Sequence, residues 1–205
     1  MKVWMAACSL LAFAAIECRA DTVADALLSG QVQQFMDDGS ITGCGVVLSA
    51  VETGVGANQT AHVFHGSISV MGLTGGLVKG RVSTIPGKKL LAGDASALAI
   101  QAARMVWVKA PGAPATALLP GQRVHQSEDR GYILYGAALP PLVDVMFAVQ
   151  DGKPIQIGMR TAKANYDVIL AGVVEMSPAQ QQQLAQCLGE FVAHVNRSEG
   201  GKASK

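Results

Sequence analysis

The clearest hydrophobic pattern in the chain is an amphipathic helix near its C-terminus, over residues 177–196. Ser177 suits the N-cap, and Pro178 suits the first helical position, where its missing N–H leaves no hydrogen bond unmade. Apolar residues then recur at helical spacing: Leu184, Leu188, Phe191, Val192 and Val195. This stripe predicts a long helix that packs one side against the rest of the protein.

A second, less regular apolar pattern lies near the start of the chain. Residues 21–38 predict a helix on an imperfect apolar face made of Val23, Ala26, Leu27, Val32, Phe35 and Met36. Gly30 is a weak point of this helix, and Asp38-Gly39-Ser40 is interpreted as the signal that ends it.

The middle of the chain alternates as strands do, with turn clusters between the segments. The predicted strands cover residues 43–48, 60–70, 77–85, 98–109, 132–138, 155–160 and 166–174. Residues 140–152 fit either a strand that ends in an Asp151-Gly152 turn or a helix that Pro141 starts and Gly152 stops. We favour the helix, because the other face of the strand would not be polar.

These elements predict an α+β fold, with a mostly antiparallel sheet of about six to seven strands and one helix from each end of the chain packed on it. A parallel α/β fold would need helices between the strands, and the middle of the sequence lacks them. We expect a single domain over residues 21–197 and a disordered tail over 198–205.

Residues 1–20 have the layout of a secretory signal peptide. Lys2 precedes an apolar run over 3–16, and a short polar tail ends at Ala20. The run is shorter than the roughly 20 residues of a bilayer-spanning helix. Glu17 before Cys18 does not suit a lipoprotein signal. The sequence therefore predicts a periplasmic or secreted protein without a membrane span after cleavage.

Charge and cysteine content narrow the partners and the compartment. The chain has 16 Lys and Arg against 15 Asp and Glu, and loss of Lys2, Arg19 and Glu17 with the leader would leave 14 of each sign. This balance excludes the basic field typical of nucleic-acid binding. Cys44 and Cys187 would then be the remaining cysteines, and in an oxidising compartment they predict one disulfide. Catalytic or metal-bound thiols are the alternative.

No motif in the sequence predicts a metal or cofactor site. His62 and His65 would point to opposite faces of a strand and could not bind one ion together. Ser67 and Ser69 lack the flanking pattern of a serine hydrolase, and the glycine-rich segment 72–80 lacks the spacing of a phosphate-binding loop.

The candidates for a functional site are accordingly few. His65, Asp144 and Asp167 are weak candidates for acid–base catalysis, the two carboxyl groups because of their apolar neighbours. Exposed connections are the expected place for binding, and they contain Gly75, Gly76, Lys79, Arg123 and His125.

Together these features predict an exported, non-catalytic binding or interaction domain, with a protein or small-molecule partner in the cell envelope. One alternative is a cell-envelope hydrolase with a His or Asp as its acid–base group. Another is a component of an envelope or secretion assembly. A cleft that brings His65, Asp144 or Asp167 within hydrogen-bonding distance of another polar side chain would favour an enzyme. The sequence does not indicate the oligomeric state.

Overall fold

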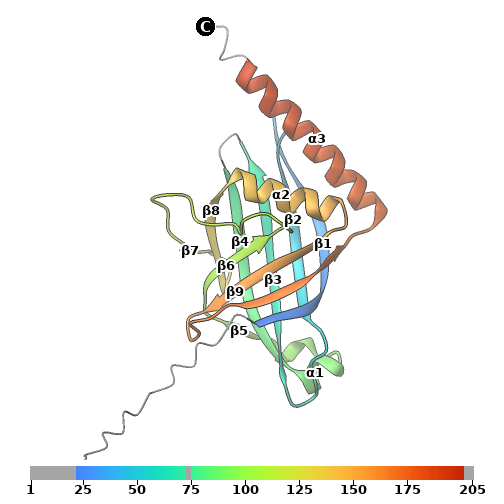
Figure 1. The fold of residues 1–205 in the computed structure, drawn as a ribbon, viewed down its shortest axis with the longest axis vertical. Coiled ribbons are helices and arrows are strands. Elements are labelled where there is room, and N and C mark those ends of the chain that lie inside the picture. The colour runs from blue at the N-terminus through green and yellow to red at the C-terminus, as the bar shows by residue number, and fades with distance from the viewer. Residues whose placement is uncertain (1–21, 73–74, 201–205) are drawn as a thin grey trace, which may run out of the picture.

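The structure, a computed structural model, describes residues 22–72 and 75–200, so the expected signal peptide and residues 201–205 of the expected tail lie outside the described residues. The chain forms a ten-stranded, mostly antiparallel sheet with helices packed on it, an α+β fold (Figure 1). In chain order the elements are β1 (Thr22–Asp37), β2 (Ser40–Glu52), β3 (Thr60–Met71), β4 (Gly75–Pro86), α1 (Gly87–Leu91), a 3₁₀ turn (Ala95–Ala97), β5 (Ala99–Gln101), β6 (Ala103–Lys109), β7 (His125–Gln126), β8 (Tyr132–Ala138), α2 (Leu139–Gln150), β9 (Pro154–Thr161), β10 (Val168–Glu175) and α3 (Pro178–Gly200).

The strands follow the order β6-β9-β10-β1-β2-β3-β4-β8-β7, with β5 also paired to β4. All neighbouring pairs are antiparallel except β1 and β10, which run parallel from Thr22 beside Val168 to Ser29 beside Glu175. The sheet bends so that β6, β9 and β10 cross in front of β2, β3 and β4 (Figure 1). The hydrophobic core fills the space between these two layers.

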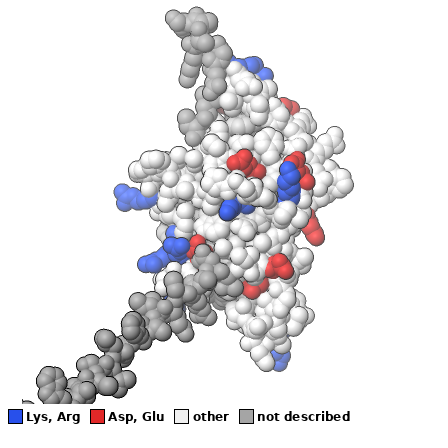
Figure 2. Space-filling model, viewed as in Figure 1, with Lys and Arg blue, Asp and Glu red and all other residues white. Residues whose placement is uncertain are grey.

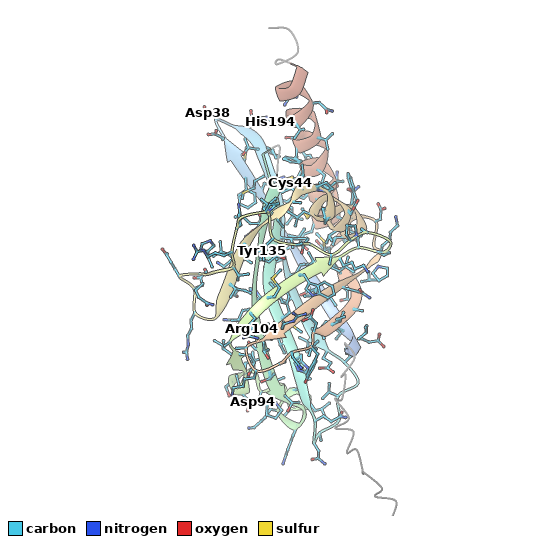
Figure 3. All side chains as sticks on the ribbon, turned by 60° about the vertical axis from the view of Figure 1, so that its left-hand side comes forward. Asp38, Cys44, Asp94, Arg104, Tyr135 and His194 are labelled. Atoms are coloured by element: carbon cyan, nitrogen blue, oxygen red, sulfur yellow. A yellow bond between two sulfur atoms is a disulfide. The ribbon has the colours of Figure 1, made fainter. Side chains whose placement is uncertain are left out.

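Two of the helices, α2 and α3, pack on the core side of the sheet. α2 contributes Leu142, Val145, Met146 and Val149 to the core, and α3 contributes Leu184, Leu188 and Phe191. A disulfide between Cys44 on β2 and Cys187 on α3 fixes the last helix to the sheet, with Cα atoms 5.9 Å apart (Figure 3). Disulfides are typical of proteins that fold in an oxidising compartment. Within the described residues, no helix is both long and apolar enough to cross a bilayer.

A chain of hydroxyl groups joins the two layers at the free edge of β6. The Val108 N–H donates to Thr116 Oγ1 at 3.0 Å, that hydroxyl lies 3.0 Å from Tyr135 Oη, and Tyr135 donates to the Val106 carbonyl at 2.9 Å. Burial raises the pKa of Tyr135 to about 12, so its hydroxyl stays protonated. The loop that carries Thr116 also bonds to β8 through a bridge between Leu118 and Ala137. The loop thereby closes the gap between the two end regions of the sheet.

Glycines allow the layers to approach. Gly80 of β4 pairs with Gly66 of β3. A Cβ atom on Gly80 would lie 2.6 Å from the ring of Phe64 and 2.9 Å from Val106. Neither neighbour can withdraw, because both side chains are buried in the core. Glycine at this position therefore sets the distance between β4 and β6.

The predicted helix over 21–38 is wrong, because this segment is strand β1. Asp38 and Gly39 both have positive φ, 45° and 75°, as the two-residue turn of a hairpin requires, so they join β1 to β2 rather than end a helix. Gly30 lies where a Cβ would be 2.6 Å from Val174 of β10. The residue that weakened the helix prediction is thus a point of close packing in the sheet.

Most of the other predicted elements are confirmed, with differences in detail. The segment 140–152 is a helix, α2, and the predicted C-terminal helix is α3. The predicted strand over 98–109 is two strands on different sides of the fold, because β5 pairs with β4 and β6 pairs with β9. The prediction of six to seven strands was too low, since β1 and the short β7 were not expected and one predicted strand is divided into β5 and β6.

Candidate functional site

A band of polar side chains crosses the face of the sheet that points away from the core. Because side chains alternate along each strand, residues directly opposite one another on neighbouring strands share a face. One row contains Glu175, Ser29, Ser49, His65, Arg81 and Tyr132, from β10 to β8. The next row contains Gln31, Val47, Ser67, Lys79 and Leu134. We call this band the outer groove.

Two adjoining hollows form the outer groove and meet at Val47 and His65, which line both. The first has a volume of about 490 Å³, and its polar lining consists of Ser29, Gln31, Ser49, His65, Glu175, Ser177 and Gln180. The second has a volume of about 480 Å³ and contains Gln33, Ser67, Lys79, Arg81, Asp129, Arg130 and Tyr132. Each hollow has the size of a small-molecule site. Their lining is more polar than that of most such sites.

His65 stands at the centre of the outer groove. Its Nδ1 atom lies 2.5 Å from the hydroxyl oxygen of Tyr132, and the two rings meet edge to face. Burial, together with the charges of Arg81 and Lys79, holds the pKa of His65 below its ordinary value. The imidazole is therefore neutral at neutral pH and can both donate and accept hydrogen bonds.

Positive charge collects at the second hollow. Arg81 lies over the Tyr132 ring at 4.8 Å from its centroid, and Lys79 lies 5.1 Å from the same centroid. Lys79 also pairs with Asp129 on the neighbouring loop, and that hydrogen bond lowers the pKa of the carboxyl group. Asp129 is 65% exposed, so solvent screens this ion pair.

The start of α3 completes the first hollow. Ser177 Oγ accepts from the Gln180 N–H at 3.3 Å, and Gln180 Oε1 accepts from the Ser177 N–H at 3.3 Å. This reciprocal pair is a capping box, which confirms the predicted N-cap and fixes both side chains at the edge of the groove.

The structure brings two of the sequence candidates together. His65 and Lys79 both line the second hollow. Gly75 and Gly76 are not in a loop, because β4 begins at Gly75, and a Cβ on Gly76 would collide with the Ser69 carbonyl. The neighbouring strands approach these two positions too closely for a side chain, so the glycines serve strand packing. Arg123 and His125 are exposed on the segment before β8, and neither lines the outer groove.

The two candidate carboxylates lie elsewhere. Asp144 is exposed on α2 beside a separate hollow that also contains Phe147 and Lys153. Asp167 is buried and accepts from Arg160 Nε at 2.6 Å and from Trp107 Nε1 at 2.8 Å. Because both of its oxygen atoms accept these bonds, Asp167 ties β6 and β9 to the start of β10.

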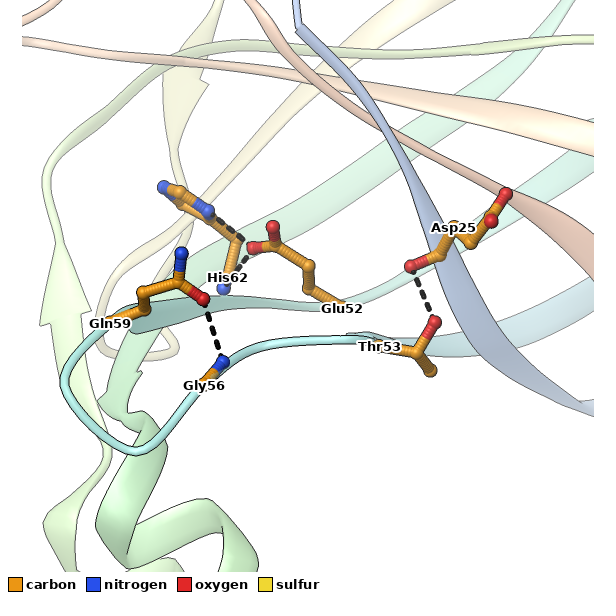
Figure 4. A network of polar contacts seen from close by, with 6 residues as sticks. All are labelled: Asp25, Glu52, Thr53, Gly56, Gln59 and His62. Carbon is orange, nitrogen blue, oxygen red and sulfur yellow. Dashed lines mark hydrogen bonds and ion pairs between the residues drawn. The ribbon is translucent and has the colours of Figure 1, made fainter.

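His62 has a partner of its own and takes no part in the groove. Its ring Nδ1 and its backbone N–H both contact Glu52 Oε2, at 2.8 and 2.9 Å (Figure 4). This pair lies beside the turn that joins β2 to β3, where Gln59 Oε1 accepts from the Gly56 N–H. His62 and His65 thus serve different sites, and no group of three potential metal ligands occurs among residues 22–72 and 75–200.

Arg81 and Tyr132 were missed by sequence reasoning. The available signal was their position on predicted strands. Arg81 is two residues from Lys79 on one strand, so the two side chains point to the same face of the sheet. Which strands pair was not known from the sequence, so the link between His65 and Tyr132, 67 residues apart, could not be found.

On the face drawn in Figure 2, acidic and basic side chains are mixed and separated by uncharged surface.

Comparison with family models, with curated proteins and with solved structures finds no match for this chain.

Proposed function

We propose that this protein is an exported, non-catalytic binding domain of the periplasm or cell exterior, and that its ligand site is the outer groove. The observation that carries the proposal is the row of polar side chains on a solvent-facing sheet surface, centred on His65 and Arg81. The expected leader and the Cys44–Cys187 disulfide support export.

The polar groups in the groove favour binding over catalysis. Tyr132 is the hydrogen-bond partner of the His65 ring. Among the described residues, no hydrogen bond joins His65 to Ser49 on the adjacent strand β2 or to Ser67 on its own strand β3. A hydrolytic nucleophile requires such a contact with its base. The groove instead offers hydroxyl, amide and cationic groups that can surround a polar ligand.

A solution NMR titration tests this proposal. Amide shifts of the ¹⁵N-labelled protein would be followed during addition of cell-envelope components, including sugars, sugar acids, sugar phosphates and peptidoglycan fragments. We expect the perturbed amides to cluster on β2, β3, β4 and β8 around the outer groove. Perturbations that cluster elsewhere, or their absence with every component, would contradict the proposal.

A cell-envelope hydrolase is the second candidate, and the contact between His65 and Tyr132 within a hollow favours it. It requires turnover of an envelope substrate that is lost in His65→Gln and retained in His62→Gln, the matched histidine outside the groove. The role of an assembly component stays a prediction.

A further inference from the structure

Arg81 has an unusual position for an arginine. Its Nε atom is buried and has no hydrogen-bond partner, and within the described residues its guanidinium contacts the Tyr132 ring but pairs with no carboxylate. Buried polar groups in folded proteins normally have partners, and an arginine fork is shaped to hold two oxygen atoms at once. The buried Nε atom is closed to a ligand, but the Arg81 side chain lines the second hollow and has no carboxylate partner within the described residues, which points to an anion as the missing partner of its guanidinium.

The surroundings of Arg81 reinforce this reading. The second hollow contains three cationic side chains, those of Lys79, Arg81 and Arg130, against the single carboxylate of Asp129. Asp129 is engaged by Lys79, so it does not neutralise Arg81. The lowered pKa of His65 has the same origin in part, because the field of Arg81 and Lys79 opposes a further positive charge.

The first hollow indicates what the rest of a ligand looks like. It continues from His65 into hydroxyl and amide groups of Ser29, Gln31, Ser49 and Gln180. Serine hydroxyl and glutamine amide groups can both donate and accept hydrogen bonds, so they can pair with the hydroxyl groups of a ligand. The acidic Glu175 stands at this end, on β10, which among the strands of the outer groove lies farthest from Arg81 in the strand order. Its charge disfavours a second negative charge there.

From these contacts we infer that the outer groove binds a small ligand that carries one oxyanion, a carboxylate or a phosphate, on a hydroxyl-rich body, with Arg81 as the main partner of the oxyanion. The inference rests on the proposed function and specifies its ligand class. Lys79 and Ser67 stand in the next row and supply further donors to the same group.

The test measures binding by calorimetry and by NMR with four probes. Glucuronate carries a carboxylate, glucose 6-phosphate carries a phosphate, and glucuronamide and glucose are their neutral counterparts. We expect at least one charged probe to bind and to perturb amides of β3, β4 and β8, with neither neutral counterpart matching it. Preference between the two charged probes distinguishes carboxylate from phosphate.

The matched variants are Arg81→Gln and Arg104→Gln, the latter an exposed arginine of β6 outside the groove. Arg81→Gln should weaken the charged probe roughly 10- to 100-fold, the range for loss of a charge-assisted hydrogen bond, and Arg104→Gln should leave it unchanged. Far-UV circular dichroism and urea unfolding establish that both variants fold, and Arg81→Lys, which keeps the charge without the fork, should fall between wild type and Arg81→Gln.

Two results would overturn the inference. If neutral probes bind in the groove as well as charged ones and Arg81→Gln changes nothing, the groove is a binding site but not for an oxyanion. If neither charged probe perturbs the groove, the oxyanion assignment is wrong, and perturbation there by any other envelope component would still uphold the proposed function.

Discussion

The disulfide between β2 and α3 offers the sharpest quantitative prediction. The change is Cys44→Ala together with Cys187→Ala, two positions that are fully buried and 143 residues apart in sequence. In the chain-entropy treatment, a cross-link that closes a loop of this length removes about 5 kcal/mol of conformational freedom from the unfolded chain. Residual structure in the unfolded state reduces this value, so we expect the free energy of unfolding to fall by roughly 2 to 5 kcal/mol.

Urea unfolding followed by Trp107 fluorescence and far-UV circular dichroism measures the loss. With a urea dependence of about 2 kcal/mol per molar, the midpoint should fall by roughly 1 to 2.5 M. Wild-type protein that is unfolded in the presence of reductant should give the midpoint of the double variant. Val192→Ala, a truncation of an exposed apolar residue on the same helix, should leave the midpoint almost unchanged.

A double variant that unfolds within about 0.5 kcal/mol of wild type would refute the reasoning, because it would mean that the cross-link restrains nothing in the unfolded chain. If reduced wild type is more stable than the double variant, part of the lost stability comes from the packing of the two cysteine side chains and not from the cross-link.

Three further predictions concern the core and the groove. Tyr135→Phe removes the hydroxyl that bonds to the Val106 carbonyl, and urea unfolding should show a loss of about 1 to 3 kcal/mol. Gly80→Ala should destabilise the protein by about 1 to 3 kcal/mol through its clash with Phe64, and Phe64→Leu combined with it should cost less than the sum of the two single changes; strict additivity would contradict the packing argument. The pKa of His65 is lower in the folded protein than its unfolded value of 6.5, so the unfolded state binds more protons and the free energy of unfolding should fall as pH drops below about 6.5. His65→Gln should reduce this fall with pH, and a variant with the same slope as wild type would contradict the assignment to His65.

The sequence predicts elements well where one pattern dominates locally. The stripe of α3, its N-cap at Ser177 and most strands of the sheet follow from spacing alone, and the two cysteines left after the leader leave one simple pairing. Residues 140–152 fitted either a helix or a strand, and the helix, favoured because the strand would have had no polar face, is confirmed as α2.

The errors come from tertiary context. β1 contains residues that fit a helical face, but pairing with β2 on one side and β10 on the other outweighs this local preference. Asp38-Gly39 fits the end of a helix, but the same dipeptide is also a strong hairpin signal, and both residues adopt the positive φ of that turn. The outer groove could not be predicted for a related reason. Arg81 and Tyr132 lie beside His65 only because of strand pairings that no local pattern encodes.

The parallel pairing of β1 with β10 has a consequence for how the chain reaches its native state. β1 is synthesised first, yet the neighbour that covers one of its edges ends about 150 residues later. A chain that emerges N-terminus first, from a ribosome or through a translocation channel, therefore holds an uncovered strand edge until nearly the whole polypeptide is available. Such high contact order delays completion of the sheet, and a product truncated before Val168 should self-associate through β1 unless a chaperone shields it.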